Sequence, residues 1–128
     1  MSHAVCFDLF NTLVNVGSVP TSVGGTTAEV LGVAARAWNQ ACFSDEHESC
    51  RPTNHFDVIR TLAHQLDPNI PLARIEDATR QRQARFDYAL TTDVSPDVIN
   101  TLRKLRDRGY KIALISNAST AEVQAWPD

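Results

Sequence analysis

The hydrophobic pattern at the start of the chain predicts a short buried strand over residues 4–7. This apolar run contains Val5 and Phe7, and short runs rich in Val and aromatic residues are typical of strands within a sheet. Asp8 follows directly, at the carboxyl end of the strand, where open α/β sheets bind ligands. A carboxylate in this position can act as a nucleophile. The alternative is that Asp8 caps a turn and Phe10 belongs to the core.

From about residue 17 to residue 92 the apolar positions repeat at helical spacing, without strand signals. A glycine-rich loop over residues 15–25 leads to Thr26-x-x-Glu29, a capping box that predicts one helix with an apolar stripe as far as Cys42. A polar patch over residues 44–52 ends this helix. Thr53 or Asn54 then caps a second helix, which Asp67-Pro68 ends.

Pro71 predicts the start of a third helix, whose apolar stripe extends through Phe86 to Leu90. Its four arginines are interspersed with acidic residues, so we expect them on a solvated face; they are Arg74, Arg80, Arg82 and Arg85. Residues 17–92 are therefore predicted to form an all-helical block.

The pattern after residue 93 is that of an α/β unit. Ser95-Pro96 is typical of a helix start, and Gly109 lies just beyond the basic last turn of this helix. Residues 110–115 form a second apolar run, which predicts a buried strand ending at Ser116-Asn117. Ser119-x-x-Glu122 predicts a further helix directly after it. Two strands with polar tips, one on each side of a helical insertion, indicate a functional site.

Composition and charge limit the functions that the chain can have. Its 128 residues suit one domain, and 43% hydrophobic with 21% charged residues is ordinary for a soluble globular protein. The formal charge of −3 argues against nucleic-acid binding, which needs a clustered basic excess. No apolar run approaches the roughly 20 residues that span a bilayer, and the N-terminus lacks a signal-peptide pattern. We therefore expect a cytoplasmic protein that binds neither nucleic acid nor a membrane.

The cysteines fit a reducing compartment, because three of them form no dense disulfide framework. Cys6 is expected in the core as a small apolar residue. Two cysteines and two histidines could form a zinc tetrad: Cys42, His47, Cys50 and His55. This is the weaker alternative, because their spacing lacks the close cysteine pair of common structural zinc sites. A surface or loop position is the favoured interpretation.

Two of these segments resemble a known family. Residues 7–13, Phe-Asp-Leu-Phe-Asn-Thr-Leu, resemble the first motif of the haloacid dehalogenase-like (HAD) hydrolases, and residues 115–119, Ile-Ser-Asn-Ala-Ser, resemble the second. The resemblance covers the chain in order. It implies a HAD-like Rossmannoid α/β core with a parallel sheet, partial in this chain, formed by residues 1–16 and 93–128. Residues 17–92 would then be an all-helical cap inserted after the first motif.

The resemblance also implies roles for individual residues and a small anionic substrate. Asp8 would be the nucleophile, and Thr12 would orient its carboxylate. Ser116 would hydrogen-bond a substrate oxygen. The backbone donors of Leu9, Phe10 and Asn117 would line an anion pocket, since oriented amides at strand tips and helix starts stabilise negative charge.

Phe10 departs from the pattern of the family's phosphatases. In these enzymes a second Asp usually stands two residues after the nucleophile and protonates the leaving alcohol, a role that phenylalanine cannot take. General acid catalysis typically raises a reaction rate about 10²–10⁴-fold, so a phosphatase with Phe10 would lose this factor. A halide leaving group needs no proton. The 2-haloacid dehalogenases of the family carry an aromatic residue here and use no metal. Arg36 and Arg51 are candidates for their cationic clamp on the substrate carboxylate, although a plain surface role is the commoner one for an arginine.

The third and fourth motifs of the family, which supply a lysine and acidic residues, have no counterpart after the second motif. Lys104 and Lys111, the only lysines, precede it. We therefore expect an incomplete polypeptide or, as the alternative, a swapped or otherwise intimate homo-oligomer that covers an open sheet edge.

Three functions follow from the sequence. The first is a HAD-like hydrolase nearest the 2-haloacid dehalogenases in its first motif, without a cofactor. The second is a phosphatase of the same superfamily that uses Mg²⁺ held by Asp8 and the main-chain oxygen of Phe10. The third is a non-catalytic interaction module.

Overall fold

The computed structural model describes residues 2–43 and 54–126. The chain forms two compact units, and each is described by itself. Unit 1 comprises Met1–Pro20 and Arg85–Asp128, and unit 2 comprises Thr21–Ala84. In the described part of the chain, no helix is long and apolar enough to cross a membrane.

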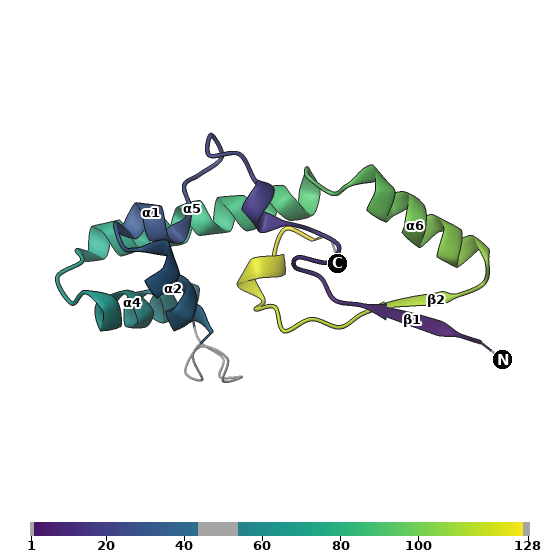
Figure 1. Ribbon diagram of the computed structural model, residues 1–128, viewed down its shortest axis with the longest axis horizontal. Coiled ribbons are helices and arrows are strands. Elements are labelled where there is room, and N and C mark those ends of the chain that lie inside the picture. Colours follow the sequence, from purple (N-terminus) through teal and green to yellow (C-terminus); the bar gives the residue numbers. More distant parts are fainter. Residues whose placement is uncertain (1, 44–53, 127–128) are drawn as a thin grey trace. The chain divides into compact units, whose positions relative to one another are not determined.

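Unit 1 is built on two parallel strands, β1 (Ala4–Phe7) and β2 (Lys111–Leu114). Ala4 pairs with Lys111 and Phe7 with Leu114, so the carboxyl ends of both strands lie at the same end of the sheet. Helix α6 (Pro96–Asp107) precedes β2 and packs against it. Figure 1 shows the strands side by side with α6 alongside them. The parallel pairing of the two predicted strands is confirmed.

The ends of α6 form as the sequence predicts. The Ser95 side chain accepts a hydrogen bond from the backbone N–H of Asp97, and Pro96 stands in the first turn. Gly109 has φ +85°, the left-handed conformation that ends a helix.

Two expectations about burial in unit 1 are wrong. All four residues of β2 are exposed, although the apolar run predicts a buried strand. Cys6 on β1 is exposed as well, and not a core residue. The reason is the size of the sheet: in the described residues it has two strands, which leave one edge of each strand without a neighbour.

The core of unit 1 forms where the first loop meets the end of α5 (Leu72–Thr91), a long helix that passes from unit 2 into unit 1. The buried residues of this core are Leu9, Val14 and Leu90. After β2, the expected Ser119–Glu122 box does form, since Glu122 accepts from the Ser119 N–H and its own N–H donates to the Ser119 hydroxyl. The helix behind it is only the short 3-10 turn η2 (Ala121–Val123).

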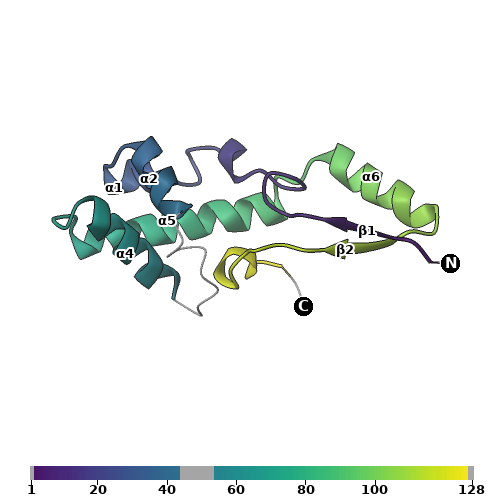
Figure 2. The same cartoon turned by 60° about the horizontal axis from the view of Figure 1, so that its bottom comes forward.

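Unit 2 is helical, and its core contains residues from four helices and from the loop before α5. The helices are α1 (Thr27–Leu31), α2 (Ala35–Cys42), α4 (His55–Leu66) and the first part of α5. Figure 2 shows α1, α2 and α4 against the part of α5 that belongs to this unit. The most deeply buried members of this core include Leu31, Ile59, Ile75 and Ala78.

The caps of unit 2 form as predicted, but the first helix is broken. The Thr26–Glu29 capping box is complete, and Asn54 caps α4. The single helix expected from Thr26 to Cys42 is wrong: α1 ends at Gly32, which has φ +74° and therefore stops the helix in the left-handed conformation. The apolar stripe continues in α2, which explains why periodicity alone did not reveal the break.

Arg85 contradicts the expected solvated face of α5. Arg74 and Arg80 are exposed, whereas Arg85 is 5% exposed. Its guanidinium donates to the carbonyl oxygens of Val19 at 3.1 Å and Val16 at 2.8 Å. Val16 lies in the short 3-10 turn η1 (Val16–Ser18). Arg85 therefore ties this turn to α5 within unit 1, and the two carbonyl bonds make burial of the charge possible.

Candidate functional site

The loop after β1 is a closed turn organised by one carbonyl group. The Leu9 oxygen accepts hydrogen bonds from the backbone N–H groups of Thr12, Leu13 and Val14, at 3.3, 2.8 and 3.1 Å. Asn11 donates its own N–H to the Val14 oxygen at 2.7 Å and has φ +62°. Asn tolerates this left-handed conformation better than most residues, so it suits the position.

The turn holds the Asp8 side chain at the carboxyl end of β1. Asp8 is exposed, and its Oδ2 accepts a hydrogen bond from the Thr12 hydroxyl at 3.3 Å. Because this bond spans four residues of the closed turn, it restricts the orientation of the carboxylate. The other carboxylate oxygen, Oδ1, has no hydrogen bond within residues 2–43 and 54–126.

Phe10 points into the core of unit 1, two residues after Asp8. Its ring meets the ring of Phe86 edge to face, with 4.9 Å between the centroids and 89° between the planes. This is a favoured geometry for an aromatic pair. Leu9 beside it is 1% exposed and packs with Val14 and Leu90. Leu9 and Phe10 therefore stabilise the fold, whereas Asp8, Asn11 and Thr12 are exposed to solvent.

The second polar tip lies beside the first. The N–H of Ile115 donates to the Phe7 oxygen at 2.9 Å, so Asp8 and Ser116 each follow the last bonded residue of their strand. The Ser116 hydroxyl accepts from the Ala118 N–H at 3.3 Å, which folds the chain back at the strand end. Neighbouring strands lie about 4.8 Å apart, so Asp8 and Ser116 follow adjacent strand ends on the same side of the sheet.

Backbone donors complete this end of the sheet. Among the described residues, none accepts a hydrogen bond from the N–H groups of Leu9, Phe10 or Asn117. N–H groups without an internal acceptor at a strand tip can bind an anion. The structure thus gathers Asp8, Thr12, the Ser116-Asn117 tip and these donors in unit 1.

The remaining candidates lie elsewhere. Arg36 is exposed on α2 in unit 2, and Arg51 lies outside the described residues. Of the possible zinc tetrad, His47 and Cys50 are also outside them, while Cys42 is half-buried in α2. Within the described ranges, no three His, Cys, Asp or Glu side chains gather in a way that could hold a metal ion.

The fit of Asp8 to Mg²⁺ is partial. One carboxylate and the main-chain oxygen of Phe10 are two hard oxygen donors of the kind that Mg²⁺ prefers. The ion usually keeps several waters and binds through one or two carboxylates together with substrate phosphate oxygens. The described residues can therefore provide part of such a shell.

The comparison with known families identifies the chain. A model of the hydrolase family described as haloacid dehalogenase-like hydrolase matches residues 3–126. The chain belongs to the haloacid dehalogenase-like hydrolases. The predicted membership of this family is confirmed, as is the α/β fold class with a helical insertion. No curated protein and no solved structure matches the chain.

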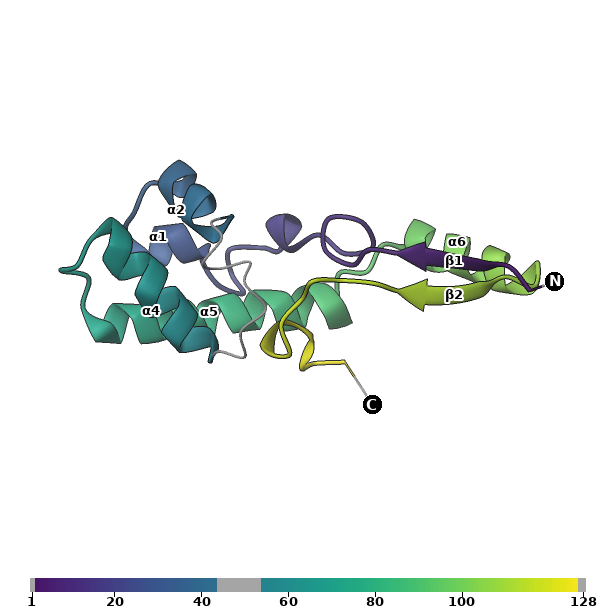
Figure 3. The ribbon, with the colours of Figure 1, turned by 90° about the horizontal axis from the view of Figure 1, so that it is seen from below.

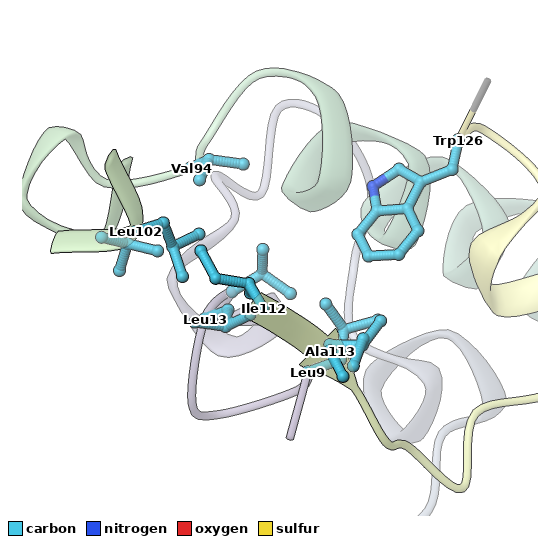
Figure 4. A pocket seen from close by; sticks show the side chains of 10 residues that line it. Leu9, Leu13, Val94, Leu102, Ile112, Ala113 and Trp126 are labelled. Atoms are coloured by element: carbon cyan, nitrogen blue, oxygen red, sulfur yellow. The ribbon is translucent and has the colours of Figure 1, made fainter. Parts of the chain in front are cut away.

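One feature of this HAD-like chain was not predicted from the sequence: an apolar groove behind the Asp8 loop. It has a volume of about 270 Å³, and its lining is formed by Leu9, Leu13, Val14, Val94, Val98, Leu102, Ile112, Ala113, Leu114 and Trp126. Figure 4 shows Leu9 and Leu13 of the loop beside Ile112 and Ala113 of β2, with Leu102 and Trp126 around the opening. The sequence signal that could have indicated this groove is the set of apolar residues on both sides of Asn11-Thr12.

Proposed function

We propose that the protein is a hydrolase that uses Asp8 as its nucleophile and that, in its first motif, stands nearest the 2-haloacid dehalogenases. The observation that carries this proposal is the pairing of Phe10 with Phe86 next to an exposed, Thr12-bonded Asp8 carboxylate. The loop offers a positioned nucleophile and no acid two residues later.

The chemistry of a carbon–halogen bond suits such a loop. An oxygen of Asp8 attacks the carbon that bears the halogen, a C–O bond forms, and the C–X bond breaks as the halide leaves with the electron pair. Water then hydrolyses the ester at Asp8 and releases a 2-hydroxy acid. Neither the attack nor the departure of halide needs a proton donor, so a phenylalanine at position 10 does not slow this step.

A small anionic substrate would be held by the donors at the strand tips. Under this proposal the N–H groups of Leu9, Phe10 and Asn117 and the Ser116 hydroxyl bind the negative oxygen atoms of the substrate. Arg36 is proposed as the cationic clamp, since a guanidinium binds a carboxylate through two parallel hydrogen bonds.

A phosphatase of the same superfamily is the second candidate. It is favoured by the partial Mg²⁺ shell of Asp8 and the Phe10 main-chain oxygen, because Mg²⁺ would neutralise phosphate charge when bound. The lack of an acid at Phe10 counts against it, because an alkoxide leaving group without proton donation loses a factor of about 10²–10⁴. A non-catalytic interaction module remains the third candidate.

Two assays on the natural protein separate these candidates. Chloride release from 2-chloropropionate in the presence of EDTA supports the dehalogenase proposal. Phosphate release from small phosphomonoesters that requires Mg²⁺ supports the phosphatase. The Asp8→Asn variant should abolish either activity, whereas the control Asp107→Asn, at an exposed site on α6, should retain it. If activity persists in Asp8→Asn, both proposals are wrong, and if neither wild-type assay shows turnover, the interaction module is favoured.

A further inference from the structure

The guanidinium of Arg85 holds both ends of the turn that follows the Asp8 loop. The turn η1 begins at Val16, and Val19 is its C-terminal cap. Two different nitrogens bind these residues: Nη2 donates to the Val16 oxygen at 2.8 Å and Nη1 to the Val19 oxygen at 3.1 Å. A planar, forked cation suits two separate acceptors, whereas an ammonium offers a single nitrogen. In Figure 3 the closed loop after β1 leads directly into η1, the short purple turn.

Val14 connects this turn to the loop that carries Asp8. It stands two residues before Val16, and both of its backbone groups close the loop. Its N–H donates to the Leu9 oxygen at 3.1 Å, and its oxygen accepts from the Asn11 N–H at 2.7 Å. A shift of η1 would therefore move Val14 and, through these two hydrogen bonds, the residues next to Asp8.

The burial of Arg85 gives these contacts their weight. The residue is 5% exposed, and a buried charge is tolerated only where hydrogen bonds compensate it. Both acceptors are backbone oxygens, so the bonds fix the course of the chain itself. The next residue, Phe86, packs on Phe10 inside the loop. Two neighbouring residues of α5 thus hold the Asp8 loop, one at its middle and one just after its end.

We propose that Arg85 is a positioning residue for Asp8: by binding both ends of η1 it fixes the end of the Asp8 loop and, with it, the orientation of the carboxylate. This inference rests on the proposed function, in which Asp8 is the nucleophile. A misplacement of reacting groups by about 1 Å can lower a rate about 10²-fold. Thr12, whose hydroxyl binds Asp8, lies in the same loop, so a loosened loop would also weaken that hydrogen bond.

Turnover measurements test the positioning role. Arg85→Met removes the bonds to η1, and kcat for chloride release from 2-chloropropionate should fall about 10- to 100-fold. The loss should appear mainly in kcat, because the nucleophile is displaced. Each variant is assayed well below its unfolding midpoint, so that kcat describes folded protein. Arg85→Lys keeps the charge but offers one nitrogen, and it should recover part of the loss. Arg80→Met, at an exposed position of the same helix, is the matched control and should keep the wild-type kcat.

Hydrogen exchange tests the same role without turnover. The N–H groups of Asn11, Leu13 and Val14 are bonded inside the loop. In Arg85→Met they should exchange about tenfold faster or more, because local opening of the loop becomes easier. The N–H of Ile115, which is bonded to β1, should keep its exchange rate. Equal acceleration at all four positions would mean that Arg85 serves only overall stability, and would overturn the proposal.

The kinetic outcomes are equally decisive. An unchanged kcat in folded Arg85→Met would overturn the proposal. If Arg85→Met does not fold, Arg85→Lys takes its place, and wild-type kcat with wild-type exchange in the loop would overturn the proposal there. If the wild-type protein releases neither chloride nor phosphate, the proposed function is wrong and the positioning role falls with it, even where faster exchange confined to the loop shows that Arg85 holds it.

Discussion

The rings of Phe10 and Phe86 meet edge to face with 4.9 Å between their centroids. Phe10 stands two residues after Asp8, and Phe86 belongs to the part of α5 in unit 1. The contact explains how the Asp8 loop can be firmly held although the Asp8 carboxylate itself is exposed. An acidic residue in place of Phe10 would have to give up this contact, so the aromatic residue serves both the fold and the proposed chemistry.

The first prediction concerns the stability that this pair provides. Phe10→Ala should lower the free energy of unfolding by about 2–4 kcal/mol, because a half-buried ring and its aromatic partner lose their contact. Urea denaturation measures this loss. In a double-mutant cycle with Phe86→Leu, the two losses should fall short of additivity by about 0.5–1.5 kcal/mol. Full additivity would show that the ring contact contributes nothing of its own.

The second prediction concerns Phe10 and reaction preference. Phe10→Asp supplies a proton donor two residues after the nucleophile, so phosphate-ester hydrolysis should rise relative to halide release by up to about 10²-fold. The matched control is Phe10→Asn, which has nearly the same shape and no acidic proton. Both variants lose the ring contact, and their unfolding midpoints should be similarly lowered. Equal phosphate release by the two variants would contradict this role of the missing acid.

The third prediction concerns the buried cation Arg85. Arg85→Met removes the hydrogen bonds to the Val16 and Val19 oxygens and should cost about 2–4 kcal/mol of unfolding free energy. Arg80→Met, at an exposed position of the same helix beside Asp77, is the control and should change stability by less than about 0.5 kcal/mol. Chemical denaturation of both variants checks the difference. Similar losses at the two sites would mean that burial of Arg85 has no energetic significance.

The fourth prediction concerns the helix break at Gly32. Gly32→Ala should destabilise the chain by about 1–2 kcal/mol, because a φ of +74° is strained for any residue with a Cβ atom. The added Cβ would also stand 3.3 Å from an Arg74 nitrogen, a flexible side chain that can give way. Gly32→Asn should cost less, since Asn adopts this conformation more readily. A stabilised Gly32→Ala variant would indicate that α1 and α2 can join into one helix.

The sequence predicted several helix ends correctly, because each of these ends has a local signal. The capping residues Thr26, Asn54 and Ser95 and the terminal Gly109 set helix boundaries through neighbouring hydrogen bonds. The helix break at Gly32 escaped because the apolar stripe continues across it.

The burial of individual side chains was predicted less well, because burial depends on distant partners. Arg85 is buried by carbonyl oxygens 66 and 69 residues away in the sequence, a relation that no local pattern contains. Cys6 and β2 are exposed because the sheet has two strands in the described residues. An apolar run in the sequence does not reveal how many strands will lie next to it. Roles of Asp8, Ser116 and Arg36 stay predictions until activity is measured.

Oxygen-isotope labelling of Asp8 tests the central proposal most directly. The natural protein is allowed many turnovers of 2-chloropropionate in H₂¹⁸O, and the peptide containing Asp8 is then analysed by mass spectrometry. If an ester forms at Asp8 and water hydrolyses it, ¹⁸O should accumulate in the Asp8 carboxylate, with no label at Asp97 or Asp107. Label that enters only the 2-hydroxy acid product, with none in Asp8, would contradict the proposal.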